Sequence, residues 1–309
     1  MGIHEKLTNA FLEELHNGNS PFQVIPQKIG SIIYCDTSNY QKEAYTTEEK
    51  KKMLFKRFII CLSIPLLSFI LFQDYPIWNT IVTIVAVIAF IWYIHKINTF
   101  NGVDYFVGKD GFSILKFEGK RTNITEEATF LFEEISQLIT GETYKKVNYS
   151  YSGTDYFFTF FSHPDSELCT KMLHEYGGSY YQEKPRDEIF EGDYLFYKKI
   201  EEQWCFYTLE KMNNQLISPT FSILISENNQ WKSIPYITFN DDCITIGDRV
   251  YDKNTIKKID FQNGTLIVEH INHSKKWFGL KEEGNIEHIP LSNLGNKKLF
   301  LLYLSSYYN

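Results

Sequence analysis

The stretch FIICLSIPLLSFILFQDYPIWNTIVTIVAVIAFIWYI, residues 58–94, consists of two apolar runs separated by QDYP at residues 73–76. At about 1.5 Å per residue, helices over these runs would span about 24 Å and about 30 Å, close to the hydrocarbon thickness of a bilayer. Neither run keeps the polar face usual for helices of soluble domains. The stretch therefore predicts a hairpin of two membrane-spanning helices over residues 53–97. The alternative is a pair of buried helices in a soluble core.

Basic residues flank this hairpin on one side. Lysines at residues 50–52, together with Lys56 and Arg57, precede the first run, and His95 and Lys96 follow the second, whereas the turn carries only Asp74. The positive-inside rule then places both ends on the cytoplasmic side. Including the aromatic residues near the ends of the runs, the predicted membrane-interface anchors are Lys56, Arg57, Trp78, Trp92, Tyr93 and Lys96.

The composition limits the remaining function classes. With 309 residues, 43% of them hydrophobic and 17% aromatic, the chain can form roughly two domains with substantial cores. The net charge of -7 and the lack of a basic stripe with interleaved aromatics argue against nucleic-acid binding. The five cysteines form no CxxC pair, which favours a reducing compartment over a disulfide framework or a thiolate metal site.

The segment before the hairpin, residues 1–50, predicts an amphipathic helix and then a short extended piece. Leu7, Phe11 and Leu15 recur at four-residue spacing, and the extended piece lies around residues 31–35. Because this segment is too short for its own core, we expect it to pack against the cytoplasmic part that follows the hairpin.

After the hairpin, residues 103–216 predict a first β-rich domain that ends in a long helix. Residues 108–111 break two extended runs and predict a β-hairpin. In KKVNYSYSGTDYFFTFF, residues 145–161, the dipeptide Ser152 and Gly153 predicts the turn of a second β-hairpin. The helix is predicted by apolar residues at four- and three-residue spacings after the N-cap Asp193, namely Phe196, Ile200, Trp204 and Tyr207.

Residues 221–309 repeat this order of strands followed by a terminal helix. YFVGKDGFSIL, residues 105–115, corresponds to YITFNDDCITI, residues 236–246. The final stretch, LSNLGNKKLFLLYLSSY, predicts a helix capped by Ser292 or Asn293. The correspondence indicates an internal duplication.

A two-span hairpin, strands joined by short turns, an acidic strand start at Glu133 and Glu134, and one closing amphipathic helix together resemble bacterial membrane proteins with pleckstrin-homology-like domains. The resemblance covers about residues 30–309. It implies an α+β membrane protein in which the transmembrane hairpin is followed by two pleckstrin-homology-like bent β-barrels, each closed by a C-terminal helix. It brings no catalytic residues to this chain.

Candidate sites for chemistry have simpler explanations. His270 and His273 would point to opposite faces of a strand, and no further ligand has suitable spacing, so no metal is expected. Ser162, His163 and Asp165 in SHPDS are neighbours in sequence, whereas catalytic triads assemble from distant segments, so a turn is the better interpretation. The first turns of phosphoinositide-binding relatives carry several basic residues, but the turns at residues 108–111 and 240–242 hold one lysine among acids. No cofactor is expected.

One motif indicates a contact surface. KKWFGL places Lys275 and Lys276 beside Trp277 and Phe278, which suits a membrane or partner contact, although a partly buried strand aromatic is the alternative.

The sequence therefore predicts a protein of the bacterial inner membrane that spans it twice, has both termini in the cytoplasm and is not an enzyme. Its cytoplasmic domains are expected to bind a protein, a peptide or the membrane surface. Two alternatives stay open: a homo-oligomeric channel or transporter accessory built on the hairpin, and an enzyme whose pocket uses acids such as Asp241, Asp242 and Asp248.

Overall fold

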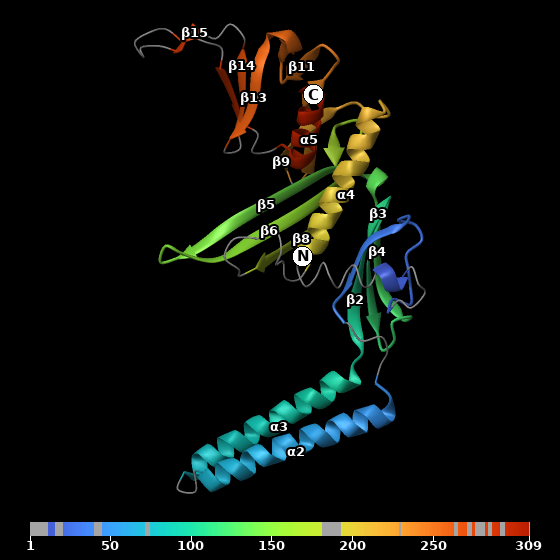
Figure 1. The fold of residues 1–309 in the computed structure, drawn as a ribbon, viewed down its shortest axis with the longest axis vertical. Coiled ribbons are helices and arrows are strands. Elements are labelled where there is room, and N and C mark those ends of the chain that lie inside the picture. Colours follow the sequence, from blue (N-terminus) through green and yellow to red (C-terminus); the bar gives the residue numbers. More distant parts are fainter. Residues whose placement is uncertain are drawn as a thin grey trace.

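The computed structural model describes residues 12–15, 21–39, 45–71, 75–180, 193–228, 230–262, 265–270, 274–275, 282–283, 286–290 and 294–308. Along its longest axis a hairpin of two long helices, a central unit and a second unit follow one another (Figure 1).

The hairpin consists of α2 (Thr47–Leu71) and α3 (Pro76–Asn98). A capping box starts α2, because the Glu49 amide donates to Thr46 Oγ1 and the Thr46 amide donates to Glu49 Oε2 at 2.8 Å. Proline at the first position of α3 suits a helix start, where its missing N–H would have no intrahelical partner. The predicted range 53–97 lies within these helices, and residues 72–74 of the turn lie outside the described residues.

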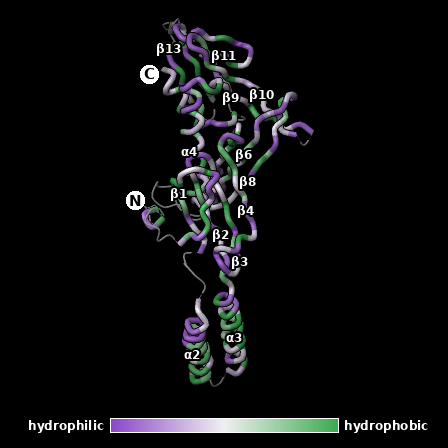
Figure 2. The backbone as a smooth tube through the Cα atoms, turned by 90° about the vertical axis from the view of Figure 1, so that its right-hand side faces the viewer, coloured by the Kyte–Doolittle hydropathy of each residue, from purple (hydrophilic) through white to green (hydrophobic). Residues whose placement is uncertain are grey.

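Both helices are long and apolar enough to cross a membrane, and only 6% of each apolar window is buried. Helices of a soluble core would bury most of these side chains. Instead the two helices pair with each other: the Phe58 and Phe90 rings lie 5.7 Å apart, and Ser68 Oγ donates to Asn79 Oδ1 at 2.8 Å. Figure 2 shows hydrophobic residues along most of both helices. The alternative of buried core helices does not agree with this exposure.

The hairpin is inserted between two adjacent strands of one sheet. This antiparallel sheet has the order β1-β2-β3-β4, formed by β1 (Ile32–Thr37), β2 (Asn101–Gly108), β3 (Gly111–Glu118) and β4 (Ile124–Leu131). β1 precedes α2 and β2 follows α3, and the two strands pair from Ile32 with Gly108 to Thr37 with Asp104. The extended piece expected around residues 31–35 is thus the edge strand of this sheet, and the predicted β-hairpin at residues 108–111 joins β2 to β3.

The segment before β1 covers one face of the sheet. Leu12 and Leu15, within the helical residues 12–15, pack on a small core that contains Phe22, Cys35 and Phe106. Leu7 and Phe11 lie outside the described residues. The expected packing of this segment against the later part is confirmed for the residues that the structure describes.

A three-stranded sheet completes the strands of the central unit. The short helix η1 (Phe132–Glu134) leads from β4 into β5 (Ile135–Val147), and the sheet has the order β5-β6-β8, with β6 (Ser150–Ser162) and β8 (Met172–Tyr180). The turn predicted at Ser152 and Gly153 was misplaced. Asn148 and Tyr149 form it with φ of 50° and 66°, whereas Gly153 lies within β6 beside a register irregularity.

Helix α4 (Tyr194–Asn213) packs between the two sheets. Phe196, Ile200 and Trp204 are buried as predicted, and Trp204 Nε1 donates to the Ile135 carbonyl at 3.2 Å. Asp193 occupies the N-cap position, but its carboxylate accepts from the Tyr176 hydroxyl at 2.9 Å and caps no backbone amide.

The second unit repeats the order of the first. Its strands are β9 (Thr220–Glu227), β10 (Gln230–Phe239), β11 (Cys243–Ile246), β12 (Arg249–Asp252), β13 (Ile256–Gln262), β14 (Thr265–His270) and β17 (Ile286–Pro290), with η2 (Lys253–Thr255) after β12 and α5 (Lys297–Tyr308) at the end. β9 to β12 form one antiparallel sheet, and a second has the order β13-β14-β17. A small pair, β15 (Ser274–Lys275) and β16 (Glu282–Glu283), lies between β14 and β17. The predicted caps Ser292 and Asn293 lie outside the described residues.

The described strands do not close into the barrels that the resemblance implied. η1 carries the chain from the sheet of β1 to β4 into the sheet of β5, β6 and β8, and η2 carries it from the sheet of β9 to β12 into the sheet of β13, β14 and β17. Within each unit the two sheets share no pairing among the described strands. What the structure gives is an α+β fold of several antiparallel sheets with two apolar helices.

The two units are joined by backbone pairing. β7 (Cys169–Thr170), from the loop between β6 and β8, pairs with Trp231 and Lys232 of β10. Asn296 binds the edge of β5. Its backbone amide donates to the Leu138 carbonyl at 2.9 Å. Its side chain accepts from the Leu138 backbone amide at 2.5 Å and donates to the Ser136 carbonyl at 3.1 Å. One hydrophobic core runs through both units.

Candidate functional site

The predicted contact residues of KKWFGL fall at the edge of what the structure describes. Lys275 belongs to β15 and pairs with Glu282. Lys276, Trp277 and Phe278 lie outside the described residues. Their role as a contact surface stays a prediction.

Four of the predicted membrane-interface anchors form two pairs at the end of the hairpin nearest the sheets. The Arg57 guanidinium lies 4.9 Å from the centre of the Tyr93 ring, and Lys96 Nζ lies 5.4 Å from the Trp92 ring. Lys56 and Trp78 are exposed. Sequence reasoning named these residues singly. The helix pairing brings Arg57 of α2 to Tyr93 of α3, whereas Lys96 and Trp92 lie one turn apart on α3.

A groove runs beside the C-terminal half of α4. The inner face of the helix is buried in the core. The opposite face carries Gln203, Phe206, Glu210 and Lys211, which line a pocket. Two pockets of about 300 Å³ each flank this face, and both include Tyr207 and Lys211.

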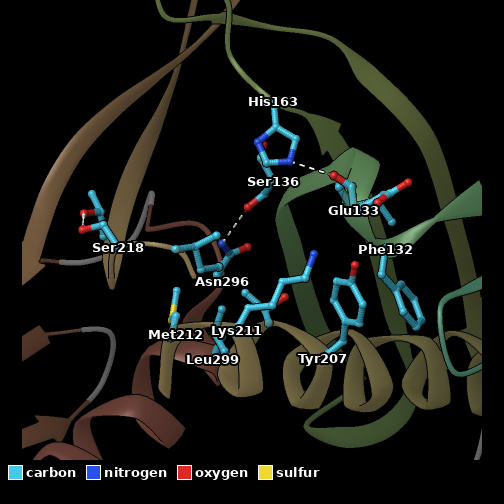
Figure 3. Close-up of a pocket in the computed structure, with 14 residues that line it drawn as sticks. Phe132, Glu133, Ser136, His163, Tyr207, Lys211, Met212, Ser218, Asn296 and Leu299 are labelled. Carbon is cyan, nitrogen blue, oxygen red and sulfur yellow. Dashed lines mark hydrogen bonds between the residues drawn. The ribbon is translucent and has the colours of Figure 1, made fainter. Parts of the chain in front are cut away.

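The first pocket, here the junction pocket, lies where the two units meet (Figure 3). Its polar lining comes from η1, β5, α4 and the loops beside them: Glu133, Ser136, His163, Thr208, Lys211, Ser218, Thr220 and Asn296. His163 Nε2 donates to the Glu133 carbonyl at 2.9 Å, which fixes the imidazole at the rim. In Figure 3, Tyr207 and Lys211 extend from α4 toward the wall that carries Glu133 and His163.

The second pocket, here the turn pocket, lies between α4 and the β2–β3 turn. Lys109 and Asp110 supply the turn side, and Phe206 and Leu216 supply apolar surface. Phe206 is 51% exposed and Leu216 is 70% exposed. Large apolar side chains that are this exposed beside a helix suit contact with another molecule.

Lys211 and Tyr207 form the ridge between the two pockets. Lys211 Nζ lies 4.4 Å from the centre of the Tyr207 ring, and Tyr207 packs on Phe132 with ring centres 5.6 Å apart. A cation held over a ring is positioned without losing its charge. The groove therefore combines apolar surface, hydroxyl and amide groups and charged groups of both signs, of which the Lys211 ammonium lies over a ring.

The structure places two of the chemical candidates that the sequence offered, the SHPDS segment and the acids of the second unit. Among the described residues no three His, Cys, Asp or Glu side chains gather as a metal site would require. The SHPDS segment is a turn, as predicted: Asp165 Oδ1 accepts from the amides of Glu167 and Cys169, while His163 faces a backbone carbonyl. Asp241, Asp242 and Asp248 are exposed on the second unit.

The groups with strongly shifted pKa belong to the core. Burial raises the pKa of the Cys205 thiol, and of the Cys35 thiol, to about 12, so neither forms a thiolate nucleophile near neutral pH. Burial also raises the pKa of Tyr176 and Tyr197, which stack at 4.2 Å, above the ordinary value. These shifts are typical of packed aromatic side chains and mark no reaction site.

Most groove residues were missed by sequence reasoning. Tyr207 was named only for its helical spacing, and His163 only within a predicted turn. Lys211 and Asn296 come from segments 85 residues apart and meet through the inter-unit junction, which no local pattern encodes. One signal was available in the sequence. Phe206 lies outside the apolar stripe of its helix, and a large apolar residue at such a position indicates a contact surface.

No family model, no curated protein and no solved structure matches this chain.

Proposed function

We propose that this protein is a membrane-tethered interaction protein of a bacterial inner membrane. In this proposal α2 and α3 span the bilayer, both termini lie in the cytoplasm, and the two units are pleckstrin-homology-like modules without catalytic activity. The groove beside α4 binds a segment of a partner protein.

The order of elements supports the choice of module. Each unit has four antiparallel strands, a short helical corner, three further main strands and a closing helix. That two halves of one chain share this order supports a duplicated module of the pleckstrin-homology-like kind, in which binding sites differ between members on a common frame.

The groove carries the proposal. It offers exposed Phe206 and Leu216 beside the fixed charge of Lys211, on a body attached to the hairpin at two adjacent strands. A peptide added to the edge of β5 is the less favourable mode near the groove, because Asn296 already binds the backbone groups of Ser136 and Leu138.

The channel alternative has weaker support. The polar side chains of the hairpin that would line a pore are Ser63, Ser68, Asn79, Thr80 and Thr83. Ser68 and Asn79 bond to each other, and Ser63, Thr80 and Thr83 donate to backbone carbonyls of their own helices. Bonding of this kind stabilises a helix pair in lipid and leaves little polar surface for a pore.

Alkaline carbonate extraction and protease accessibility test the tether. With a C-terminal tag, the protein should stay in the membrane pellet, and the tag should be cleaved in inverted vesicles but protected in spheroplasts. Release by carbonate would refute the tether, and cleavage in spheroplasts would refute the orientation.

Site-specific crosslinking in cells tests the groove. Benzoylphenylalanine at position 206 should give one discrete protein adduct that Lys211→Glu and Leu216→Ser each abolish. The matched control is the same probe at Val250, which is 68% exposed on the second unit. Equal adducts at both positions, or an adduct unaffected by Lys211→Glu, would contradict a specific groove.

A further inference from the structure

The hairpin of β5 and β6 extends beyond the sheet that it belongs to. β8 pairs with β6 from Thr154 onward, so residues 145–153 form a two-stranded ribbon that no third described strand covers. We call residues 144–151 the arm tip.

The arm tip exposes large side chains to an unusual degree. Tyr144 is 57%, Val147 is 61% and Tyr149 is 99% exposed. The left-handed turn at Asn148 and Tyr149 presents the Tyr149 ring at the far end. A hairpin tip in water normally carries small polar turn residues, so this cluster indicates a surface that is covered by something.

The charge of the arm tip favours one kind of covering surface. Lys145 and Lys146 lie between the exposed aromatics, and no acidic residue occurs between Glu142 and Asp155. Lys145 reaches Asp155 at 2.7 Å at the base of the ribbon. Exposed tyrosines beside a basic residue such as Lys146 are typical of segments that lie in the headgroup region of an anionic leaflet.

The arm belongs to a body that the proposed tether holds at the membrane. β1 and β2 connect this body directly to both helices, which raises the effective concentration of the arm at the surface that the helices enter.

We propose that the arm tip is a second membrane contact, in which Tyr144, Val147 and Tyr149 enter the headgroup region and Lys146 binds anionic lipid. The proposal rests on the membrane tether of the proposed function. Together the hairpin and the arm fix the orientation of the body relative to the bilayer, so that the α4 groove faces a defined direction.

Photo-crosslinking in reconstituted vesicles tests this contact. The full chain carries benzoylphenylalanine at position 149, 92 or 250, in vesicles of phosphatidylcholine alone or mixed with phosphatidylglycerol. Adducts are identified by mass. Position 92, in the hairpin, reports the tether, and position 250, exposed on the second unit, reports random encounter.

We expect phospholipid adducts at positions 149 and 92 and none at 250. Lys146→Gln should lower the yield at 149 about fivefold in mixed vesicles and leave it unchanged in phosphatidylcholine. Lys232→Gln, on the second unit, should leave the yield unchanged in both.

Each other outcome overturns a distinct statement. Lipid adducts at 92 without adducts at 149 would refute the arm contact and leave the tether standing. Absence at both positions would refute the tether itself. Adducts at 149 that join two copies of this chain would show that the tip is a protein interface and would overturn the lipid proposal.

Discussion

Arg121 and Asp104 form an ion pair of 2.6 Å in which the two side chains are 0% and 2% exposed. The guanidinium also donates to the Asn39 carbonyl at 2.5 Å and lies 4.9 Å from the Phe117 ring. Asn39 follows β1 and Asp104 belongs to β2, so this one side chain joins the two segments next to the points where the α2–α3 hairpin leaves and rejoins the sheet.

Arg121→Ala should be strongly destabilising. It leaves the Asp104 carboxylate buried without its cation, which typically costs about 3 to 5 kcal/mol. Chemical unfolding of the purified protein in detergent, followed by circular dichroism, measures the change. Lys116→Ala is the matched control, because Lys116 pairs with Glu126 at 2.6 Å on the same sheet but in an exposed site, where loss is expected to cost below about 1 kcal/mol. Equal losses of stability from the two changes would contradict a special role of the buried Arg121–Asp104 ion pair.

Asn296→Gly should loosen the junction between the units. Glycine tolerates the φ of 60° at this position, so the change removes the two side-chain hydrogen bonds to β5 without backbone strain. We expect a loss of about 1 to 3 kcal/mol and faster amide exchange at Leu138. Hydrogen exchange with mass spectrometry measures the latter. Unchanged protection of residues 136–138 would show that the Asn296 side chain does not stabilise this edge of β5.

Acid should destabilise the central unit through His174. This imidazole lies against Phe130 and Phe160, its Nε2 is 2.9 Å from the Tyr197 hydroxyl, and burial lowers its pKa below the ordinary value. The unfolded chain then binds the proton more readily. The stability that neutral His174 contributes is therefore complete above about pH 6.5 and is lost as the pH falls toward the folded pKa.

The histidine effect is measured as the difference in unfolding free energy between about pH 7.5 and about pH 5.5. This difference should be smaller in His174→Phe than in the parent protein, even though the variant is less stable at both pH values because Tyr197 loses its partner. An identical pH difference in both proteins would assign the acid effect to other groups.

Ser68→Ala should weaken the pairing of α2 with α3. Its hydroxyl is hydrogen-bonded to Asn79 across the hairpin, and bonds of this kind in lipid contribute about 0.6 kcal/mol on average. Titration with sodium dodecyl sulfate measures the shift. Ser63→Ala serves as the control, since Ser63 bonds to the Ile60 carbonyl of its own helix and should have less effect.

Local patterns predicted those elements whose determinants are local. The apolar helices, the β2–β3 hairpin and the buried face of α4 at Phe196, Ile200 and Trp204 follow from residues close together in sequence. The turn between β5 and β6 was misplaced because glycine serves a bulge as readily as a turn, and Asn148 with Tyr149 is a less common left-handed pair.

Features that depend on distant pairing were not predictable. Three such contacts have partners more than 50 residues apart in the sequence. They are the pairing of β1 with β2 across the hairpin, the pairing of β7 with β10 of the other unit, and the hydrogen bonds of Asn296 to β5. The groove follows from these contacts, so its lining by His163 and Lys211 has no signature in either segment alone.

The insertion of α2 and α3 between paired strands has a consequence for biosynthesis. β1 leaves the ribosome long before β2, and Ile32 must find Gly108 across 75 intervening residues. Once α2 and α3 associate side by side, the ends of that long loop already lie together, and closing it costs little further entropy. In the proposed membrane topology, insertion of α2 and α3 is therefore the nucleating event for a β-sheet that lies outside the lipid. A nascent chain that fails to insert lacks the helix pair that aligns its first two strands.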